Sequence, residues 1–82
     1  MTKSYTYRII IEPDGKFFHG YVPALSGCHT FGETIAETKL YLKDAIEVYV
    51  ESLIKEKKII PSDVSFESFE TVSFPYSQKV YA

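Results

Sequence analysis

One stretch constrains the fold of this chain more than any other: PALSGCHTFGET, which starts at Pro23, and the helix that it opens. Pro23 is expected to end a strand, because proline has no backbone N–H to donate to a neighbouring strand. Gly27 and Gly32 mark two positions where the backbone needs either a positive φ or a close approach to another segment. Thr34 and Glu37 have the S/T-x-x-E spacing of a capping box, in which each side chain satisfies a free amide of the other residue. The sequence therefore predicts a helix with a fixed start, against which a sheet can pack.

This helix is expected to run from Ile35 to Lys57, until Pro61 prevents its continuation. At 3.6 residues per turn, apolar side chains gather on one face and charged side chains on the opposite face. The apolar face contains Ile35, Leu42, Ala45, Ile46, Tyr49 and Leu53, and the charged face contains Lys43, Asp44, Glu47, Glu51 and Lys55. Leu40 lies among the charged residues as an exposed apolar side chain. The pattern is typical of a helix that packs one face on a sheet.

Three segments before the helix have the pattern of strands. Residues Tyr5–Glu12 alternate in polarity, and the odd-numbered side chains are expected to be buried. Pro13-Asp14-Gly15 is a turn sequence, and Phe17–Val22 then returns as the second strand of a hairpin. A short third strand is expected around Cys28–Phe31.

A further strand, Val64–Phe74, is expected after the helix. Phe66 and Phe69 have opposite parity in it, which predicts a bulge if both are buried. Pro75 interrupts the segment, and Tyr76–Ala82 forms a last short stretch. The order β-β-β-α-β predicts an α+β fold of two layers, in which one long helix covers a mainly antiparallel sheet.

Composition indicates one small domain that spans residues 1–82. Of the residues, 45% are hydrophobic and thirteen are aromatic, which is enough for a core. The net charge of −2 gives no basic surface for nucleic acid or an anionic membrane. No apolar run is long enough to span a membrane, and no signal-peptide pattern opens the chain. The single cysteine, Cys28, excludes an internal disulfide and fits the cytoplasm.

Candidate catalytic and metal-binding side chains do not form a convincing set. Cys28 and His29 are adjacent on an extended segment, so their side chains point in opposite directions, and Cys28 is expected to be a buried structural residue. His19, Cys28 and His29 do not have the spacing of a zinc site. The acidic residues of the expected strands are explained as solvated positions: Glu12, Glu67 and Glu70. No enzyme activity, cofactor or metal is therefore predicted.

Several motifs together resemble the HicB-type antitoxin domain. They are the YRIIIE strand, the P-D-G turn, the aromatic strand that ends in proline, and the Gly-Cys and Gly-Glu-Thr corners before the helix. The residues that carry the resemblance are Pro23, Gly27, Cys28, Gly32, Glu33, Thr34 and Glu37, followed by Ala45 to Tyr49 and Ile60-Pro61. The resemblance covers about residues 5–75. Thr38-Lys39 departs from it, since the family tends to have alanine followed by an apolar residue there.

The resemblance implies a partial ribonuclease H-like α+β sandwich that binds another protein. HicB-like domains neutralise HicA, a small basic toxin that cleaves RNA. Full antitoxins usually add a helix-turn-helix or ribbon-helix-helix domain, which these 82 residues do not contain, so no autonomous DNA binding is expected. The alternative is an orphan α+β structural or ligand-binding domain with no toxin partner.

Two surfaces are candidates for partner binding. The first is an acidic helix face that could meet a basic protein, although an ordinary solvated face is the favoured explanation. Its residues are Glu37, Leu40, Asp44, Glu47 and Glu51. The second is the C-terminal part, where residues 64–74 or 76–82 could pair with another chain through an exposed edge. A homodimer through this edge or tail is expected, and a monomer whose tail turns back at Pro75 is the alternative.

Overall fold

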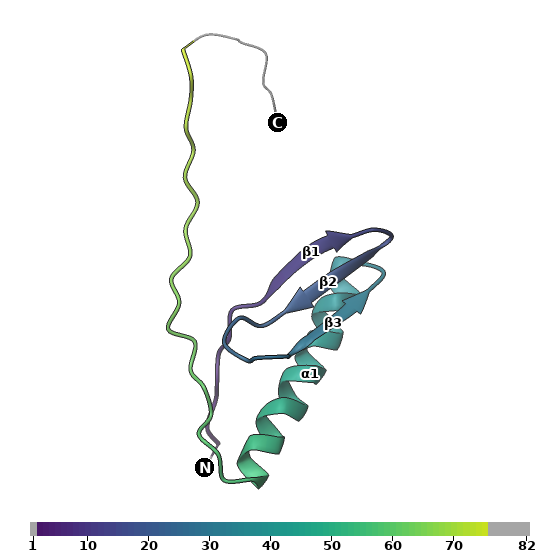
Figure 1. Ribbon diagram of the computed structural model, residues 1–82, viewed down its shortest axis with the longest axis vertical. Helices are drawn as coiled ribbons and strands as arrows, with labels where there is room; N and C mark the ends of the chain where they lie inside the picture. Colours follow the sequence, from purple (N-terminus) through teal and green to yellow (C-terminus); the bar gives the residue numbers. More distant parts are fainter. Residues whose placement is uncertain (1, 76–82) are drawn as a thin grey trace.

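The computed structural model describes residues 2–75 and shows a three-stranded sheet packed on one long helix (Figure 1). The strands are β1 (Ile10–Asp14), β2 (Phe17–Tyr21) and β3 (His29–Gly32), in the order β1-β2-β3 with both pairs antiparallel. The helix α1 (Ile35–Lys55) covers one face of the sheet. These two layers confirm the predicted α+β class.

The hairpin of β1 and β2 forms as predicted, but its turn lies later than the predicted Pro13-Asp14-Gly15, because Pro13 and Asp14 belong to β1 and pair with Phe18 and Phe17. Asp14 faces Phe17 in the register, so two residues make the turn. Gly15 is the first of them and has a φ of 63°, a conformation that side chains disfavour.

β1 is shorter than predicted and displaced toward the C-terminus. Alternation predicted a strand over Tyr5–Glu12, whereas β1 begins at Ile10 and ends at Asp14. Its partner β2 ends opposite Ile10, and Pro23 follows soon after with no N–H to continue the pairing. Tyr7 and Ile9 nevertheless pack against the core, as the odd-numbered buried face requires.

The loop between β2 and β3 closes on itself through backbone hydrogen bonds. The amide of Val22 donates to the carbonyl of Cys28 at 3.1 Å, and the amide of Cys28 donates to the carbonyl of Leu25 at 3.0 Å. Gly27 has a φ of 78°, which confirms the predicted need for a positive φ at this position.

The start of α1 has the predicted cap. Thr34 is the N-cap residue, and its Oγ1 accepts a hydrogen bond from the amide of Glu37 at 3.0 Å. Glu37 Oε1 in turn accepts from the amide of Glu33 at 3.3 Å, one residue before the amide that an ideal capping box uses.

The helix ends at Lys55, two residues before the predicted end. Lys57 adopts a left-handed conformation with a φ of 56°. Its amide donates to the carbonyl of Ile54 at 3.1 Å, and the amide of Lys58 donates to the carbonyl of Leu53 at 2.9 Å. This is a Schellman termination, in which glycine usually occupies the left-handed position.

The helix approaches the sheet closely through two glycines. A Cβ atom on Gly20 would lie 2.8 Å from Thr38 Cγ2, and a Cβ atom on Gly32 would lie 2.5 Å from Thr38 Oγ1. Gly32 therefore serves close approach, the second of its two predicted roles. Thr38 is fully buried, and its hydroxyl donates to the carbonyl of Thr34 at 2.7 Å, which satisfies the buried polar group.

The core lies between the sheet, the loop after β2 and the middle of α1. Its buried apolar residues are Val22, Leu25, Cys28 and Leu42. Ala45, Ile46 and Tyr49 pack against this cluster from the predicted helix face. Ile35 does not, and it is 57% exposed.

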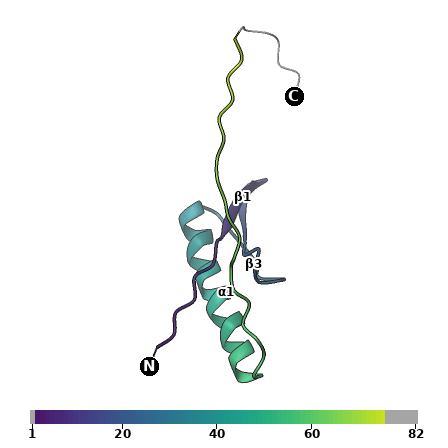
Figure 2. The ribbon, with the colours of Figure 1, turned by 90° about the vertical axis from the view of Figure 1, so that its left-hand side faces the viewer.

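The predicted strand Val64–Phe74 does not form within residues 2–75. This segment is extended but has no strand partner, and it runs away from the two layers in both views (Figures 1 and 2). Its large apolar side chains are 77% to 92% exposed. The bulge predicted between Phe66 and Phe69 required both to be buried, and both are exposed. The stretch Tyr76–Ala82 lies outside the described residues.

Candidate functional site

The acidic face of α1 is the first candidate site. The side of the helix that holds Thr38 and Leu42 is buried, and the predicted acidic residues lie on the other side. Leu40 is 59% exposed among the carboxylates. Glu37 is half-buried because it takes part in the helix cap, whereas the remaining acidic residues of this face, Asp44, Glu47 and Glu51, are exposed.

The acidic face also carries two apolar residues, Tyr41 and Val48, that the sequence analysis did not identify. Tyr41 is 44% exposed and Val48 is 67% exposed, so the carboxylates surround apolar side chains rather than a uniformly charged surface. The negative charge of Glu37, together with a hydrogen bond to it, raises the pKa of Tyr41, so the phenol keeps its proton. Tyr41 and Val48 are seven residues apart and therefore lie on the same helix face, which was the signal available in the sequence.

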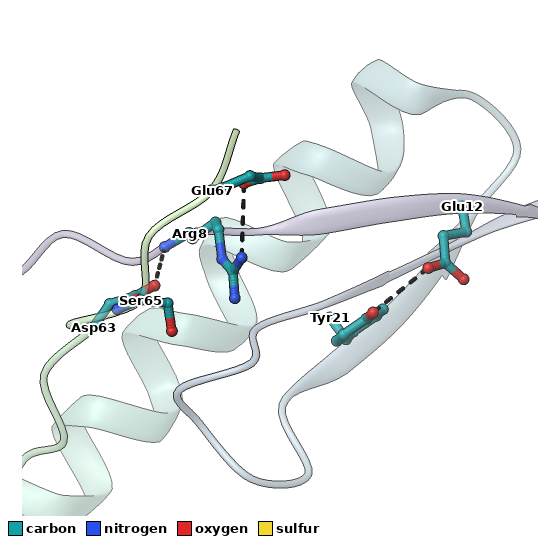
Figure 3. Close-up of polar contacts among 6 residues, drawn as sticks. All are labelled: Arg8, Glu12, Tyr21, Asp63, Ser65 and Glu67. Carbon is teal, nitrogen blue, oxygen red and sulfur yellow. Dashed lines mark hydrogen bonds and ion pairs between the residues drawn. The ribbon is translucent and has the colours of Figure 1, made fainter. Parts of the chain in front are cut away.

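The outer face of the sheet, which α1 does not cover, carries an aromatic cluster. His19 Nε2 and His29 Nδ1 lie 3.3 Å apart on neighbouring strands. The His19 ring stacks on Phe31, with 4.7 Å between centroids, and on Tyr21, with 5.6 Å. The Tyr21 hydroxyl is 3.5 Å from Glu12 Oε1 (Figure 3). This cluster gives the outer face a mixed aromatic and polar character.

The three residues weighed as metal ligands are not brought together. His19 and His29 meet on the outer face, whereas Cys28 is buried in the core as predicted, where burial raises the pKa of its thiol. Over residues 2–75, no group of three His, Cys, Asp or Glu side chains is placed to hold a metal ion. In the same part of the chain no helix is long and apolar enough to cross a membrane.

The strand carboxylates also lie apart. Glu12 contacts Tyr21 at the sheet, and Glu67 lies 3.8 Å from Arg8 Nη1 at the start of the extended segment (Figure 3). These contacts are far from the arrangement of converging carboxylates that metal-dependent hydrolysis requires. They instead show how the extended segment is attached, because the amide of Arg8 also donates to Asp63 Oδ2 at 2.6 Å.

A groove lies between the segment before β1 and α1. It has a volume of about 610 Å³. Its apolar walls come from Tyr5, Tyr7, Ile9, Leu40 and Ile46. At its margin Lys39 and Lys43 add positive charge and Glu47 adds negative charge. A groove with apolar walls is suited to apolar side chains.

Comparison with known proteins gives one consistent family. The chain matches the HicB-like antitoxins of bacterial toxin-antitoxin systems over residues 7–82. It is 39% identical over 61 residues to a UPF0150 protein of Synechocystis sp., covering 72% of this chain and 76% of the relative. It is 44% identical over 59 residues to a UPF0150 protein of Thermoplasma acidophilum, covering 72% and 84%. Among solved structures, it matches a chain of the HicA3 and HicB3 toxin-antitoxin complex with a TM-score of 0.62 and 32% identity, covering 73% of this chain and 70% of that chain.

Proposed function

Because the chain belongs to the HicB-like antitoxins of bacterial toxin-antitoxin systems, we propose that it is a protein-binding module that neutralises a HicA-type toxin. The match to a chain of a HicA3 and HicB3 complex is the observation that carries this proposal. On this proposal the module acts without catalysis, in the cytoplasm where its toxin would act. The partial ribonuclease H-like description stays a prediction.

The acidic face of α1 is the proposed toxin-binding surface. A toxin of this type is basic, and exposed carboxylates of one sign favour the approach of an oppositely charged protein. Leu40, Tyr41 and Val48 supply apolar contact area between the charges. Interfaces usually combine such an apolar centre with a polar rim.

Charge reversal on α1 tests this surface. The double variant Asp44→Lys/Glu47→Lys should weaken binding of a HicA-type toxin from the same genome by at least about tenfold, mainly through slower association. The matched control, Glu12→Lys/Asp14→Lys, changes the net charge equally but lies on the hairpin. Titration calorimetry and association rates at two salt concentrations are the measurements.

The outcomes separate the function from the surface. Equal weakening by both variants would show a general charge effect and would refute the α1 surface. If the wild-type chain bound no HicA-type toxin and did not relieve its toxicity on co-expression, the antitoxin function itself would be refuted, and the orphan domain would be the remaining interpretation.

A further inference from the structure

The two histidines of the chain meet on the outer face of the sheet, and neither belongs to the core. His19 Nε2 and His29 Nδ1 are 3.3 Å apart. The register pairs His19 of β2 with Phe31 of β3, and Tyr21 with His29, which makes the two histidines diagonal neighbours on one face. Ten positions separate them in the sequence, so it is the register of β2 with β3 that brings the two imidazoles together.

The separation of the two nitrogens is that of two ligands on one zinc ion. Zinc binds imidazole nitrogen at about 2.0–2.1 Å in a tetrahedral arrangement, so two such nitrogens lie about 3.3–3.4 Å apart. The 3.3 Å between His19 Nε2 and His29 Nδ1 agrees with this value. At the right angles of a square-planar site, the same bond lengths would require about 2.8–3.0 Å. The spacing therefore suits tetrahedral zinc better than square-planar copper or nickel.

Aromatic neighbours hold both imidazole rings in place. The His19 ring stacks on Phe31, with 4.7 Å between centroids and 29° between planes, and on Tyr21, with 5.6 Å and 25°. The His29 ring meets Phe31 edge to face, with 6.2 Å between centroids and 85° between planes. Rings that are already oriented lose little conformational entropy on binding, which favours a bound metal ion.

The histidine pair is open to solvent, and a carboxylate lies on the same face. His29 is exposed and His19 is half-buried, so the pair can be reached without opening the core. Glu12 is the register partner of His19 on β1, and directly opposite residues of antiparallel strands share one face of the sheet. Glu12 therefore places negative charge on the face that would receive a cation.

We propose that His19 and His29 bind a zinc ion through Nε2 and Nδ1, with water in the two remaining positions. Neutral imidazole is a good ligand for zinc, and either ring nitrogen can serve. Over residues 2–75 no group of three His, Cys, Asp or Glu side chains is placed to hold the ion. A site with two protein ligands is open, unlike the closed four-ligand sites of structural zinc, so the domain folds without the ion and binds it reversibly.

Other zinc ligands of the described chain are poorer candidates. The exposed carboxylates of α1, such as Asp44 and Glu47, are oxygen ligands of the kind that Mg²⁺ and Ca²⁺ prefer. Cys28 is buried, and burial raises the pKa of its thiol, whereas zinc binds the accessible thiolate. The inference is independent of the proposed antitoxin function, because zinc binding is measured with no toxin present.

Titration calorimetry of the full chain with zinc chloride tests the proposal. The wild type should bind one zinc ion per chain, and an excess of Mg²⁺ should not displace it, because Mg²⁺ prefers oxygen ligands. His19→Asn and His29→Asn should each weaken zinc binding at least about tenfold, because each removes one of the two protein ligands. In NMR spectra of the ¹⁵N-labelled chain, zinc should shift the signals of His19 Nε2 and His29 Nδ1.

A control with the same composition moves one imidazole to the other face of the sheet. His29→Thr/Thr30→His keeps two histidines, but Thr30 is the register partner of Gly20, whose face meets Thr38 of α1. The zinc affinity of this variant should fall as far as that of His29→Asn. Should the exchange prevent folding, the two single variants still decide, because they change an exposed and a half-buried position.

A second control removes carboxylates from the acidic face of α1. Asp44→Asn/Glu47→Asn should leave the zinc affinity unchanged, because neither side chain belongs to the histidine pair. Circular dichroism should show the same helix content in every variant, with and without zinc.

Four outcomes would overturn the inference. A wild-type chain without saturable zinc binding would refute it, and binding that both single histidine variants leave intact would place the ion elsewhere. Displacement of zinc by Mg²⁺ would assign the ion to carboxylates. Wild-type affinity in a folded His29→Thr/Thr30→His variant would show that the meeting of the two imidazoles is not required.

Discussion

The approach of α1 to the sheet gives the sharpest stability prediction, because the two glycines beneath Thr38 differ in what an added methyl group would meet. On Gly20 the nearest atoms are Thr38 Cγ2 at 2.8 Å and Leu42 Cδ2 at 3.3 Å, both on side chains. On Gly32 they are Thr38 Oγ1 at 2.5 Å and the backbone nitrogen of Thr38 at 2.8 Å. A side chain can move aside, whereas the helix backbone cannot without shifting the whole layer.

The magnitudes follow from this difference. Overpacking lowers the free energy of unfolding by about 1–3 kcal/mol. Replacing glycine by alanine also raises it by about 0.4–1 kcal/mol, because the unfolded chain then has less conformational entropy. Gly20→Ala should therefore destabilise the domain by about 1 kcal/mol, and Gly32→Ala by about 2–3 kcal/mol or more. Thr38→Ala alone should cost about 1 kcal/mol, through its lost methyl group and its lost hydrogen bond to Thr34.

Double variants separate the two cases. Removing Thr38 Cγ2 gives the new methyl group of Gly20→Ala room, so Gly20→Ala/Thr38→Ala should be more stable than the sum of the single changes by about 1 kcal/mol. Gly32→Ala/Thr38→Ala keeps the clash with the backbone and should show a smaller coupling. Urea denaturation followed by circular dichroism measures all five variants. Near-neutral effects at both glycines, or full rescue of Gly32→Ala by Thr38→Ala, would refute the close-packing argument.

Three further predictions concern the ends of α1 and the extended segment. Thr34→Ala removes the N-cap and should lower the free energy of unfolding by about 1 kcal/mol, measured by urea denaturation, and an unchanged midpoint would contradict the cap. Lys57→Gly relieves the left-handed residue and should stabilise by up to about 1 kcal/mol, whereas Lys57→Ala should not. The amides of Arg8 and Ser65 donate to Asp63 and lower its pKa, so the stabilisation from this carboxylate is present above its unfolded pKa and is lost as the pH falls through the lower folded value. Asp63→Asn should therefore make the free energy of unfolding depend less on pH in the acidic range, as measured by urea denaturation at several pH values. An unchanged pH dependence would contradict the hydrogen bonds from the Arg8 and Ser65 amides to Asp63.

Local chemistry made part of the fold predictable. The Thr34 cap and the positive φ of Gly15 and Gly27 depend on a few adjacent residues, and all three are found in the structure. The burial of Thr38 was missed because it depends on how closely the helix approaches Gly20 and Gly32 on two strands of the sheet, and this approach is a tertiary contact. The start of β1 was misplaced for a related reason, since the length of a strand depends on its partner.

The same distinction applies to the candidate sites. The acidic face of α1 follows from helix periodicity, so the exposed positions of Asp44 and Glu47 could be predicted from the sequence alone. The meeting of His19 with His29 depends on the register of β2 with β3, which the sequence does not specify. Whether residues 64–74 form a strand could not be predicted, because an extended segment becomes a strand only when a neighbouring strand is available to pair with it.

Because Cys28 is buried, the reaction rate of its thiol reports how often the core around it becomes exposed to solvent. The side chain is 5% exposed and its burial raises its pKa, so in the closed domain it is both shielded and protonated, whereas only an accessible thiolate reacts quickly with disulfide reagents. Since Cys28 is the single cysteine of the chain, every labelling event reports the same location. The labelling rate of the unmodified protein, followed by mass spectrometry, therefore measures how often the core around Cys28 opens, and a rate faster than global unfolding assigns that opening to the loop between β2 and β3.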